Sequence, residues 1–513
     1  MSETNSQQPC TEIPQDAEPG FLDLSPQWGM AAPRGGKTVV TRVLKDGATV
    51  PLFLGQTLIN SLRDLGYNNT TSALCEHVDN AIQWGATEVR VYFRQIGKQP
   101  NQRIDVLVYD NGKGMAPHVL KVAMAFGGSM VYDNRHGIGR YGMGMKAAAL
   151  NMTRSIDVYS WQEPRAFYSM TLDVDKIGQD LHNMIELPAP ELSDARPSEV
   201  TDMFTKPLDG TRRRPDLEDL LADEPNELTE QLGRSGTIVY MPKCDRLTYS
   251  TAKTLADHAI KDMGRIYRRF IDKGVQLYVN NRQVEAFAPT YRMPSARHAK
   301  VQGLTETRSA LVDSWTVQLP VTEGSPNMTV VRIRMFLLPV HAWASLGRTT
   351  LNNSLHVFDG HIVSYLRNER EVEIGAEARL NLKKHSINAW LRVEIEFTAD
   401  GDEVFGVAAN KQGVRLQEYA AELILEHDDN RFQRNITDMR KTIRDRQLRI
   451  AAAEQVGQTS DAERHASDTE GVQGVALPTP SVDTAEQAAA LEGGDTSSGC
   501  HCPIALKRRR PSR

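Results

Sequence analysis

Apolar and polar positions alternate regularly through the middle of the chain, and this pattern predicts an α+β fold. Apolar residues spaced three or four apart predict helices between the strands. The first clear helix lies within residues 69–85, NTTSALCEHVDNAIQWG, and Thr71 or Ser72 is expected to cap it. Its apolar stripe comprises Leu74, Val78, Ala81 and Ile82. Short apolar runs predict strands at 87–94, 106–109, 155–172, 235–241, 330–338 and 389–397.

The pattern also divides the chain into segments, which are residues 1–37, 38–247, 248–427, 428–455 and 456–513. The first and last are polar and low in aromatic residues, so both are predicted to be disordered. The second and third are α/β domains, and a charged, proline-rich insertion interrupts the former at about 183–235. The fourth is a helix rich in Arg and Lys that is expected to leave the globular part, and the last ends in four basic residues, 507–510.

The second α/β domain begins with a basic helix at 253–273. Its charged face comprises Lys261, Arg265, Arg268 and Arg269. The sequence VQLYVNNRQVEAF follows, and its Asn280-Asn281 pair is typical of the tight turn of a β-hairpin.

Composition limits the class of protein but does not identify a binding partner. The chain has 513 residues and a net charge of −5, which is too small to indicate a charged ligand. Its five cysteines are scattered apart from Cys500 and Cys502, and they are expected to be reduced. The polar N-terminus and the lack of a long apolar run predict neither a signal peptide nor a membrane span. We therefore expect a soluble protein of the cytoplasm, or of the nucleus in a eukaryote.

Two glycine-rich stretches carry the candidate chemistry. The apolar run 106–109 ends in Asp110, and Gly112 and Gly114 follow, as in a buried strand that enters a tight loop. An aspartate there can accept a hydrogen bond in an otherwise apolar pocket.

The second stretch places glycines 137, 139, 142 and 144 directly before Lys146 and a strong helix-forming sequence. Free N–H groups at a helix N-terminus favour an anion, so the two stretches together predict a nucleotide site. The glycines also satisfy the dinucleotide fingerprint G-x-G-x-x-G. However, the loop-like residues before them do not supply the strand that this fingerprint requires.

The helix at 69–85 offers polar groups to the same site. Glu76, Asn80 and Gln83 lie away from the apolar stripe, since residues four apart stack on one face of a helix. A carboxylate and an amide are therefore expected to project together from a helix packed on a sheet.

Taken in order, these stretches resemble the four motifs of the GHKL ATPases, which include gyrase B, heat-shock chaperones, sensor histidine kinases and MutL. The matching residues are Glu76-x-x-Asp79-Asn80-Ala81, Asp110-x-Gly112-x-Gly114-Met115, Gly139-x-x-Gly142-x-Gly144 with Lys146, and Gly236-Thr237. The resemblance looks closest to the microrchidia (MORC) branch and its bacterial relatives, in the phrases EHVDNAI, IGRYGMGMK and NKQG. It implies a Bergerat-type ATP-binding domain followed by a transducer-like domain.

The resemblance also implies a role for each matching residue. Asp110, with Gly112, Gly114 and Met115, would bind adenine above Thr237. Asn80 would hold Mg²⁺, and Glu76 would act as the general base for ATP hydrolysis. The residues expected to enclose the phosphates are Gly139, Gly142, Gly144 and Lys146. The pattern departs from the family where Gln83 replaces a common aspartate.

Lys411, in the phrase NKQG, matches the transducer lysine that reaches the γ-phosphate in MORC and MutL-type proteins. A surface lysine in a turn is the alternative. The resemblance favours a slow ATPase that acts as a nucleotide-gated, dimerising clamp, with DNA as partner. A chaperone for protein clients is an alternative, and a phosphotransfer kinase is a weaker one because the first histidine, His77, lies inside the first motif.

Overall fold

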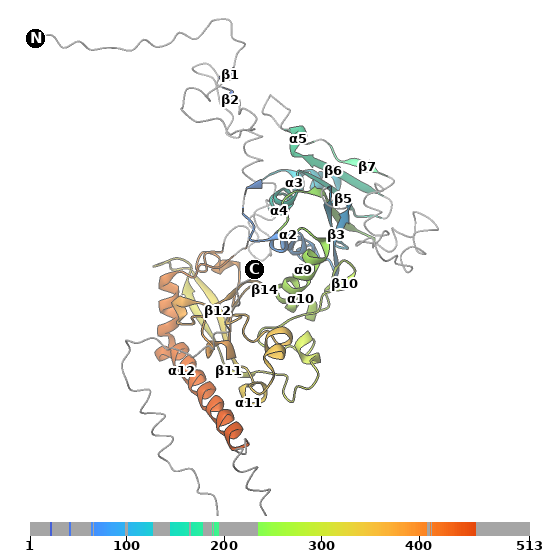
Figure 1. The fold of residues 1–513 in the computed structure, drawn as a ribbon. Coiled ribbons are helices and arrows are strands. Elements are labelled where there is room, and N and C mark those ends of the chain that lie inside the picture. Colours follow the sequence, from blue (N-terminus) through green and yellow to red (C-terminus); the bar gives the residue numbers. More distant parts are fainter. Residues whose placement is uncertain are drawn as a thin grey trace, which may run out of the picture. The chain divides into compact units, whose positions relative to one another are not determined.

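A computed structural model describes most of the chain between the two ends. The described residues are 21–22, 41–42, 63–64, 66–97, 101–126, 144–163, 166–177, 187, 189–193, 234–407, 411 and 413–457. Residues 1–450 belong to one compact unit, which contains both large sheets (Figure 1). The predicted α+β class is confirmed.

The first sheet has eight strands in the order β10-β9-β3-β4-β8-β5-β6-β7, and only the β3–β9 pair is parallel. The strands are β3 (Glu88–Ile96), β4 (Arg103–Asp110), β5 (Ser155–Trp161), β6 (Phe167–Asp173), β7 (Glu191–Ser193), β8 (Gly236–Cys244), β9 (Gln276–Val279) and β10 (Arg282–Gln283). Because β7 belongs to this sheet, the predicted insertion at about 183–235 contributes at least one strand to the fold.

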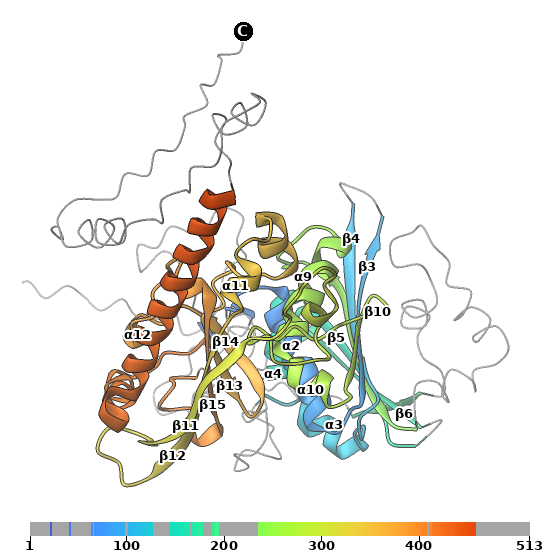
Figure 2. The ribbon, with the colours of Figure 1, turned by 90° about the horizontal axis from the view of Figure 1, so that it is seen from below.

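Helices pack on the face of the first sheet that is turned toward the second sheet, as Figure 2 shows for α2, α9 and α10. The helices of this region are α2 (Thr70–Gln83), α3 (Pro117–Met124), α4 (Gly144–Met152), α5 (Val174–Ile177), α9 (Ala252–Ile266) and α10 (Arg268–Asp272). The opposite face carries buried aromatic side chains, among them Tyr109 and Trp161. Central strand β4 is thus buried on both faces, which explains its continuous apolar run.

Helix α2 begins two residues earlier than the sequence predicted. Its N-cap is Asn69 rather than Thr71 or Ser72. The Asn69 side chain accepts a bond of 2.8 Å from the Ser72 backbone N–H, and the Asn69 N–H donates to Ser72 Oγ at 3.0 Å. Ser72 therefore takes part in the cap as the third residue of a reciprocal capping box.

The second sheet has five strands in the order β11-β12-β15-β13-β14, with only β13 and β15 parallel. The strands are β11 (Ala310–Pro320), β12 (Met328–Leu337), β13 (Val363–Arg367), β14 (Arg370–Gly375) and β15 (Leu391–Phe397). The other elements are η1 (Arg297–Lys300), α11 (Val340–Trp343), η2 (Thr350–Ser354), η3 (Ala378–Leu380), η4 (Asn388–Trp390), η5 (Ala399–Gly401) and α12 (Glu418–Gly457).

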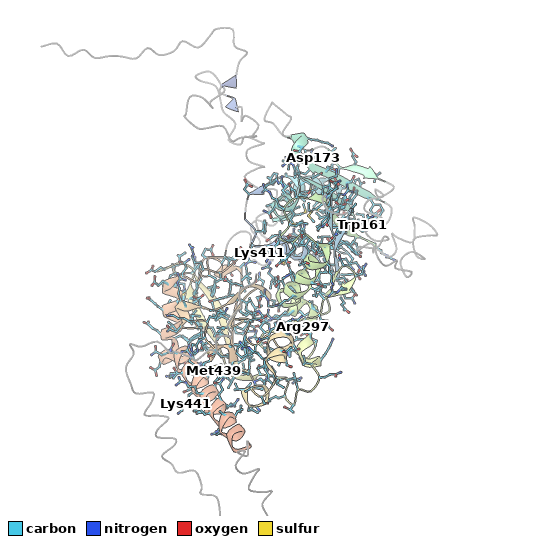
Figure 3. The ribbon with its side chains drawn as sticks, viewed as in Figure 1. Trp161, Asp173, Arg297, Lys411, Met439 and Lys441 are labelled. Carbon is cyan, nitrogen blue, oxygen red and sulfur yellow. The ribbon has the colours of Figure 1, made fainter. Side chains whose placement is uncertain are left out.

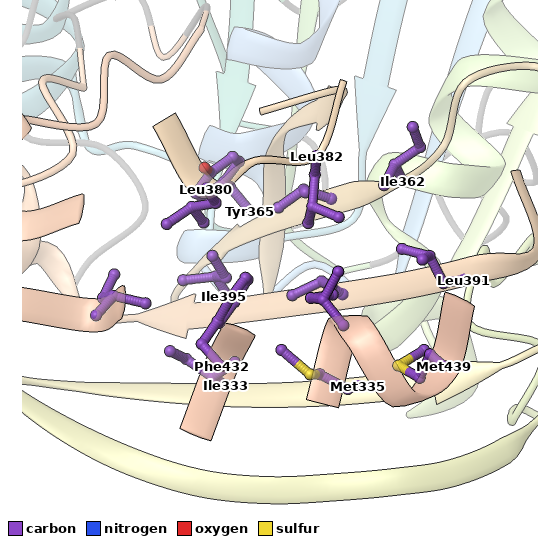
Figure 4. Close-up of a cluster of buried hydrophobic side chains, with 14 of the residues drawn as sticks. Ile333, Met335, Ile362, Tyr365, Leu380, Leu382, Leu391, Ile395, Phe432 and Met439 are labelled. Carbon is purple, nitrogen blue, oxygen red and sulfur yellow. The ribbon is translucent and has the colours of Figure 1, made fainter. Parts of the chain in front are cut away.

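Helix α12 remains on the globular part, contrary to the prediction that the basic helix leaves it. The helix changes direction at His427–Asn430, where the backbone is not helical. Beyond this kink, Phe432 and Met439 are fully buried and belong to the same core as Ile333 and Met335 of β12 (Figure 4). The apolar positions of α12 therefore decide its location, although its composition is basic.

The structure also corrects the predicted domain boundary near residue 247. Helix α9 packs on α2 and β3, and β9 pairs with β3, so the first sheet and its helices continue to Gln283. The predicted hairpin is confirmed, and Asn280 and Asn281 both adopt positive φ in its turn. Phe21–Leu22 (β1) pairs with Thr41–Arg42 (β2), while the rest of the predicted N-terminal segment lies outside the described residues.

Within the described part of the chain, no helix combines the length and the apolar character that a membrane crossing needs.

Candidate functional site

Glu76 and Asn80 lie one turn apart on α2, as the sequence predicted. Glu76 is only 3 % exposed, and Asn80 is partly buried. Burial raises the pKa of the Glu76 carboxyl above its ordinary value, and the neighbouring Lys411 opposes this effect. Among the described residues, Glu76 Oε1 has no hydrogen-bond partner, so one buried acceptor is open to a ligand or water.

The Glu76 carboxylate also limits which residue can begin α4. A Cβ atom on Gly144 would lie 2.3 Å from Glu76 Oε2, which is too close for any other residue without a shift. Glycine thus allows the N-terminus of α4 to approach this carboxylate. The preceding glycines of the third motif, Gly139 and Gly142, lie outside the described residues.

Asp110 ends strand β4 and is held by the loop that follows. Its Oδ1 accepts a bond of 2.9 Å from the Gly112 N–H. Burial raises the pKa of the Asp110 carboxyl to about 7, although the Gly112 bond lowers it. Gly114 has φ +62°, and a Cβ there would lie 1.8 Å from the Trp161 carbonyl oxygen, so this turn requires glycine.

Thr237 lies directly beside Asp110, because the two residues pair across β8 and β4. Its Oγ1 is 3.0 Å from Oγ of Ser160 on β5. The Ser160 hydroxyl also accepts a bond of 2.8 Å from the Met115 N–H and contacts the Gly236 carbonyl at 3.1 Å. Ser160 thus ties the second motif to the fourth.

Lys146 is buried in α4, close to α3. Its Nζ donates to the Ala123 carbonyl at 2.6 Å and lies 5.9 Å from the centre of the Phe126 ring. Burial lowers the pKa of the Lys146 amine to about 8. In this arrangement the amine contacts α3, and of the glycines expected to share its role Gly144 is described, whereas Gly139 and Gly142 lie outside the described residues.

Lys411 brings a charge from the second sheet's region to the first motif (Figure 3). Its Nζ lies 3.1 Å from Glu76 Oε2 and 2.9 Å from Asp79 Oδ2. All three side chains are buried, with exposures of 7 %, 3 % and 0 % for the lysine, the glutamate and the aspartate. Lys411 also has φ +50°, an uncommon backbone conformation for a residue other than glycine.

Two further side chains hold Asp79. Arg370 Nε lies 3.1 Å from Asp79 Oδ1, and the Tyr267 hydroxyl donates to the same oxygen at 2.8 Å. Arg370 Nη1 also contacts the Lys411 carbonyl at 3.4 Å. Burial tends to raise the pKa of the Asp79 carboxyl, but Arg370 and Lys411 outweigh it and hold this pKa below its ordinary value.

Residues 67–211 match the family described as histidine kinase-, DNA gyrase B- and HSP90-like ATPases. The chain contains a GHKL-type ATPase domain. The matched segment includes Glu76, Asn80, Asp110 and Lys146, whereas Thr237 and Lys411 lie beyond it. None of the curated proteins matches the chain, so nothing here supports the MORC branch specifically.

The oxygen ligands that the GHKL-type domain offers suit a metal ion that binds together with a nucleotide. Among the described residues, no three His, Cys, Asp or Glu side chains gather in a way that could hold a metal ion. Mg²⁺ bound with a nucleotide needs only one or two protein oxygens, because phosphates and water supply the other ligands. On α2, the Asn80 amide oxygen and the open Glu76 Oε1 would be the oxygens available to such a complex.

Sequence reasoning missed three side chains of the GHKL-type site, namely Ser160, Arg370 and Tyr267. The sequence places Asp79 in the first motif but predicts no role for its side chain. The apolar surroundings of Ser160 at the end of β5 were the one signal that could have drawn attention to it. Nothing local marks Arg370 or Tyr267, which meet Asp79 from 291 and 188 residues away in the sequence.

Proposed function

We propose that this protein binds and hydrolyses ATP in the GHKL-type domain and acts as a nucleotide-gated, dimerising clamp on DNA. The single observation that carries the proposal is the Lys411–Glu76 ion pair. It connects a residue beyond the ATPase domain to the glutamate expected to act on the attacking water. Nucleotide state and the position of the second sheet's region are thereby linked through one side chain.

The adenine end of the nucleotide is assigned to the Asp110 loop. The Asp110 carboxylate would accept a hydrogen bond from the exocyclic amine of adenine. In largely apolar surroundings, this bond would favour a purine that carries such an amine. Gly112, Gly114 and Met115 form the loop that approaches the base. Thr237, in register with Asp110, lies at the adjacent position of the sheet.

The phosphate end is assigned to α2 and α4. Asn80 would hold Mg²⁺, and Gly139, Gly142, Gly144 and Lys146 would bind the phosphates at the N-terminus of α4. Helix N-termini favour anions because their N–H groups are unpaired and the helix dipole is positive there. Lys146 would then have to exchange the Ala123 carbonyl for a phosphate oxygen.

Glu76 is assigned as the general base. Its open Oε1 can accept a hydrogen bond from the attacking water, and its raised pKa makes it a better proton acceptor than an ordinary glutamate. Lys411 opposes this rise as long as it remains paired with the carboxylate.

Lys411 supplies the gating step. In the structure its ammonium group is shared by Glu76 and Asp79. The γ-phosphate carries more negative charge than a single carboxylate and would draw Lys411 Nζ toward it. That exchange frees Glu76 for water and shifts the segment that carries Lys411.

Size-exclusion chromatography of the full chain tests the clamp. The wild type is expected to elute as a monomer alone and as a dimer with a non-hydrolysable ATP analogue. Glu76→Gln should form persistent dimers with ATP and Mg²⁺, whereas the matched variant Asn80→Ala should not. Monomers under every condition would refute the clamp while leaving ATP binding intact.

The partner is tested by turnover. DNA is expected to increase ATP hydrolysis, with an effect that falls steeply as salt rises. If unfolded protein stimulates turnover and DNA does not, the chaperone alternative holds instead. The kinase alternative gains no support from His77, because this side chain is 4 % exposed and too buried to receive a phosphoryl group.

A further inference from the structure

The loop 381–388 and helix α12 form one surface, although they are about fifty residues apart in the sequence. Arg440 Nε donates to Asn388 Oδ1 at 3.0 Å, and its Nη2 donates to the Asn381 carbonyl at 2.8 Å. The Asn388 amide in turn donates to the Lys383 carbonyl at 2.7 Å. These bonds hold the lysines of the loop beside the arginines of the helix.

We call this surface the basic platform, and it comprises Lys383, Lys384, Arg440, Lys441 and Arg444. All except the partly buried Arg440 are exposed. None of the five has a carboxylate partner within ion-pair distance among the described residues. Burial lowers the pKa of the Arg440 guanidinium, and the nearby charge of Arg444 lowers it further, so like charges adjoin here.

The geometry of α12 keeps acids to one side of the platform. At about 100° per residue, Arg440, Lys441 and Arg444 fall within an arc of about 100°. Asp438 and Asp445 lie outside that arc, and the apolar stripe that contains Met439 occupies the other side and is buried on the second sheet (Figure 3). The platform is therefore a continuous cationic strip along the helix and its loop.

The charged face of the other basic helix, predicted at 253–273, is already paired with acids. Arg268 and Arg269 of α10 are paired with Glu394, and Arg268 and Arg265 are paired with Glu371. These charges join the first sheet's helices to the second sheet. The four residues of the charged face noted in the sequence for that helix, Lys261, Arg265, Arg268 and Arg269, are thus all paired with acids, whereas the five platform cations have no acid partner in the described part of the chain.

We infer that the basic platform binds the phosphate backbone of a nucleic-acid duplex, an inference that rests on the proposed clamp on DNA. Unpaired Lys and Arg on a rigid surface gain affinity by releasing counterions from a phosphate backbone. An anionic membrane is less suited, because a membrane-surface helix needs an exposed apolar face and that of α12 is buried against the sheet.

The inference is tested with full-length protein, a non-hydrolysable ATP analogue and a DNA duplex, by measuring affinity against salt concentration. The platform variant Lys384→Gln with Lys441→Gln removes two exposed charges and leaves Arg440 in place. Its matched control is Lys253→Gln with Arg348→Gln, which removes two exposed charges elsewhere. Both double variants are expected to keep wild-type ATP turnover without DNA.

The platform variant should bind the duplex at least severalfold more weakly at low salt. Its slope of log affinity against log salt should become shallower by up to about 1.8, at about 0.9 for each lost phosphate contact. The control should keep the wild-type slope. If DNA binds and both double variants keep that slope, the platform is refuted and the clamp stands.

Binding to anionic vesicles in place of DNA, or no DNA binding at any salt, would also refute the inference. Nucleotide-dependent dimers would survive either result. If those dimers are absent while the platform variant alone loses DNA affinity, the clamp fails and the platform holds.

Discussion

Lys411 Nζ lies 2.9 Å from Asp79 Oδ2, and this contact joins residues separated by 332 positions in the sequence. Asp79 is fully buried, and its other oxygen accepts from Arg370 and Tyr267. One carboxylate on α2 therefore gathers Tyr267, which lies between α9 and α10, Arg370 of β14 and Lys411. Glu76, one turn earlier, shares the same lysine, so the proposed catalytic base and the proposed coupling residue are electrostatically connected.

The first prediction concerns Lys411. Lys411→Met keeps much of the apolar stem but removes the charge, so it should lower ATP turnover at least 100-fold while ATP affinity changes only severalfold. The reason is that the proposed role of the lysine concerns the γ-phosphate and Glu76, not the adenine. Steady-state hydrolysis and nucleotide titration measure the two effects, with exposed Lys253→Met as control. Wild-type turnover in Lys411→Met would exclude the role.

The second prediction concerns the stability of the buried ion network. Asp79→Asn leaves Arg370 and Lys411 without their shared countercharge, and breaking a buried pair in this way costs about 3–5 kcal/mol. The free energy of unfolding from urea titration should fall by that order. Exposed Asp438→Asn on α12 should change it by less than about 0.5 kcal/mol. Equal losses in the two variants would show that the network adds nothing.

The third prediction concerns pH and ATP affinity. Burial raises the pKa of the Asp110 carboxyl to about 7, and only the ionised carboxylate can accept a hydrogen bond from the adenine amine without donating one. Affinity for a non-hydrolysable analogue should therefore fall about tenfold per pH unit below 7, as the ionised fraction falls. Asp110→Asn should bind weakly and lose this dependence. A wild-type affinity that stays constant between pH 5.5 and 8 would contradict the assignment.

The raised pKa of Asp110 also predicts that folding stability falls as pH rises, whereas ATP affinity rises. The folded pKa of about 7 lies above the unfolded value of about 4, so the folded state favours the protonated carboxyl. The stabilising effect of Asp110 is present at low pH and is lost as pH rises through about 4 to 7. Without nucleotide, Asp110→Asn should melt above the wild type at pH 8, and differential scanning calorimetry would reveal the difference.

The last prediction concerns the approach of α4 to Glu76. Gly144→Ala places a methyl group 2.3 Å from Glu76 Oε2, so the carboxylate or the helix must move. Turnover should fall at least tenfold, whereas adenine binding at Asp110 should change little. Gly347→Ala is the control, because a Cβ there meets nothing within 4 Å. Equal turnover in the two variants would show that Glu76 tolerates displacement.

Local patterns were sufficient for part of the site. The apolar stripe of α2 sets which face carries Glu76 and Asn80, because helical periodicity relates neighbours four residues apart. The turns at Gly114 and at Asn280–Asn281 were also predictable locally, because glycine and asparagine adopt positive φ more readily than other residues. The family match supports the prediction that this part of the chain is an ATPase domain.

Tertiary structure decided what periodicity cannot express. The pairing of β9 with β3, the docking of α12 and the burial of Lys411 against α2 each join segments that are far apart in the chain. The sequence by itself determined the ATPase motifs and the residues that form them. Only the fold could bring Arg370 and Tyr267 to Asp79, because a buried charge selects its partners by position in space rather than by spacing along the chain.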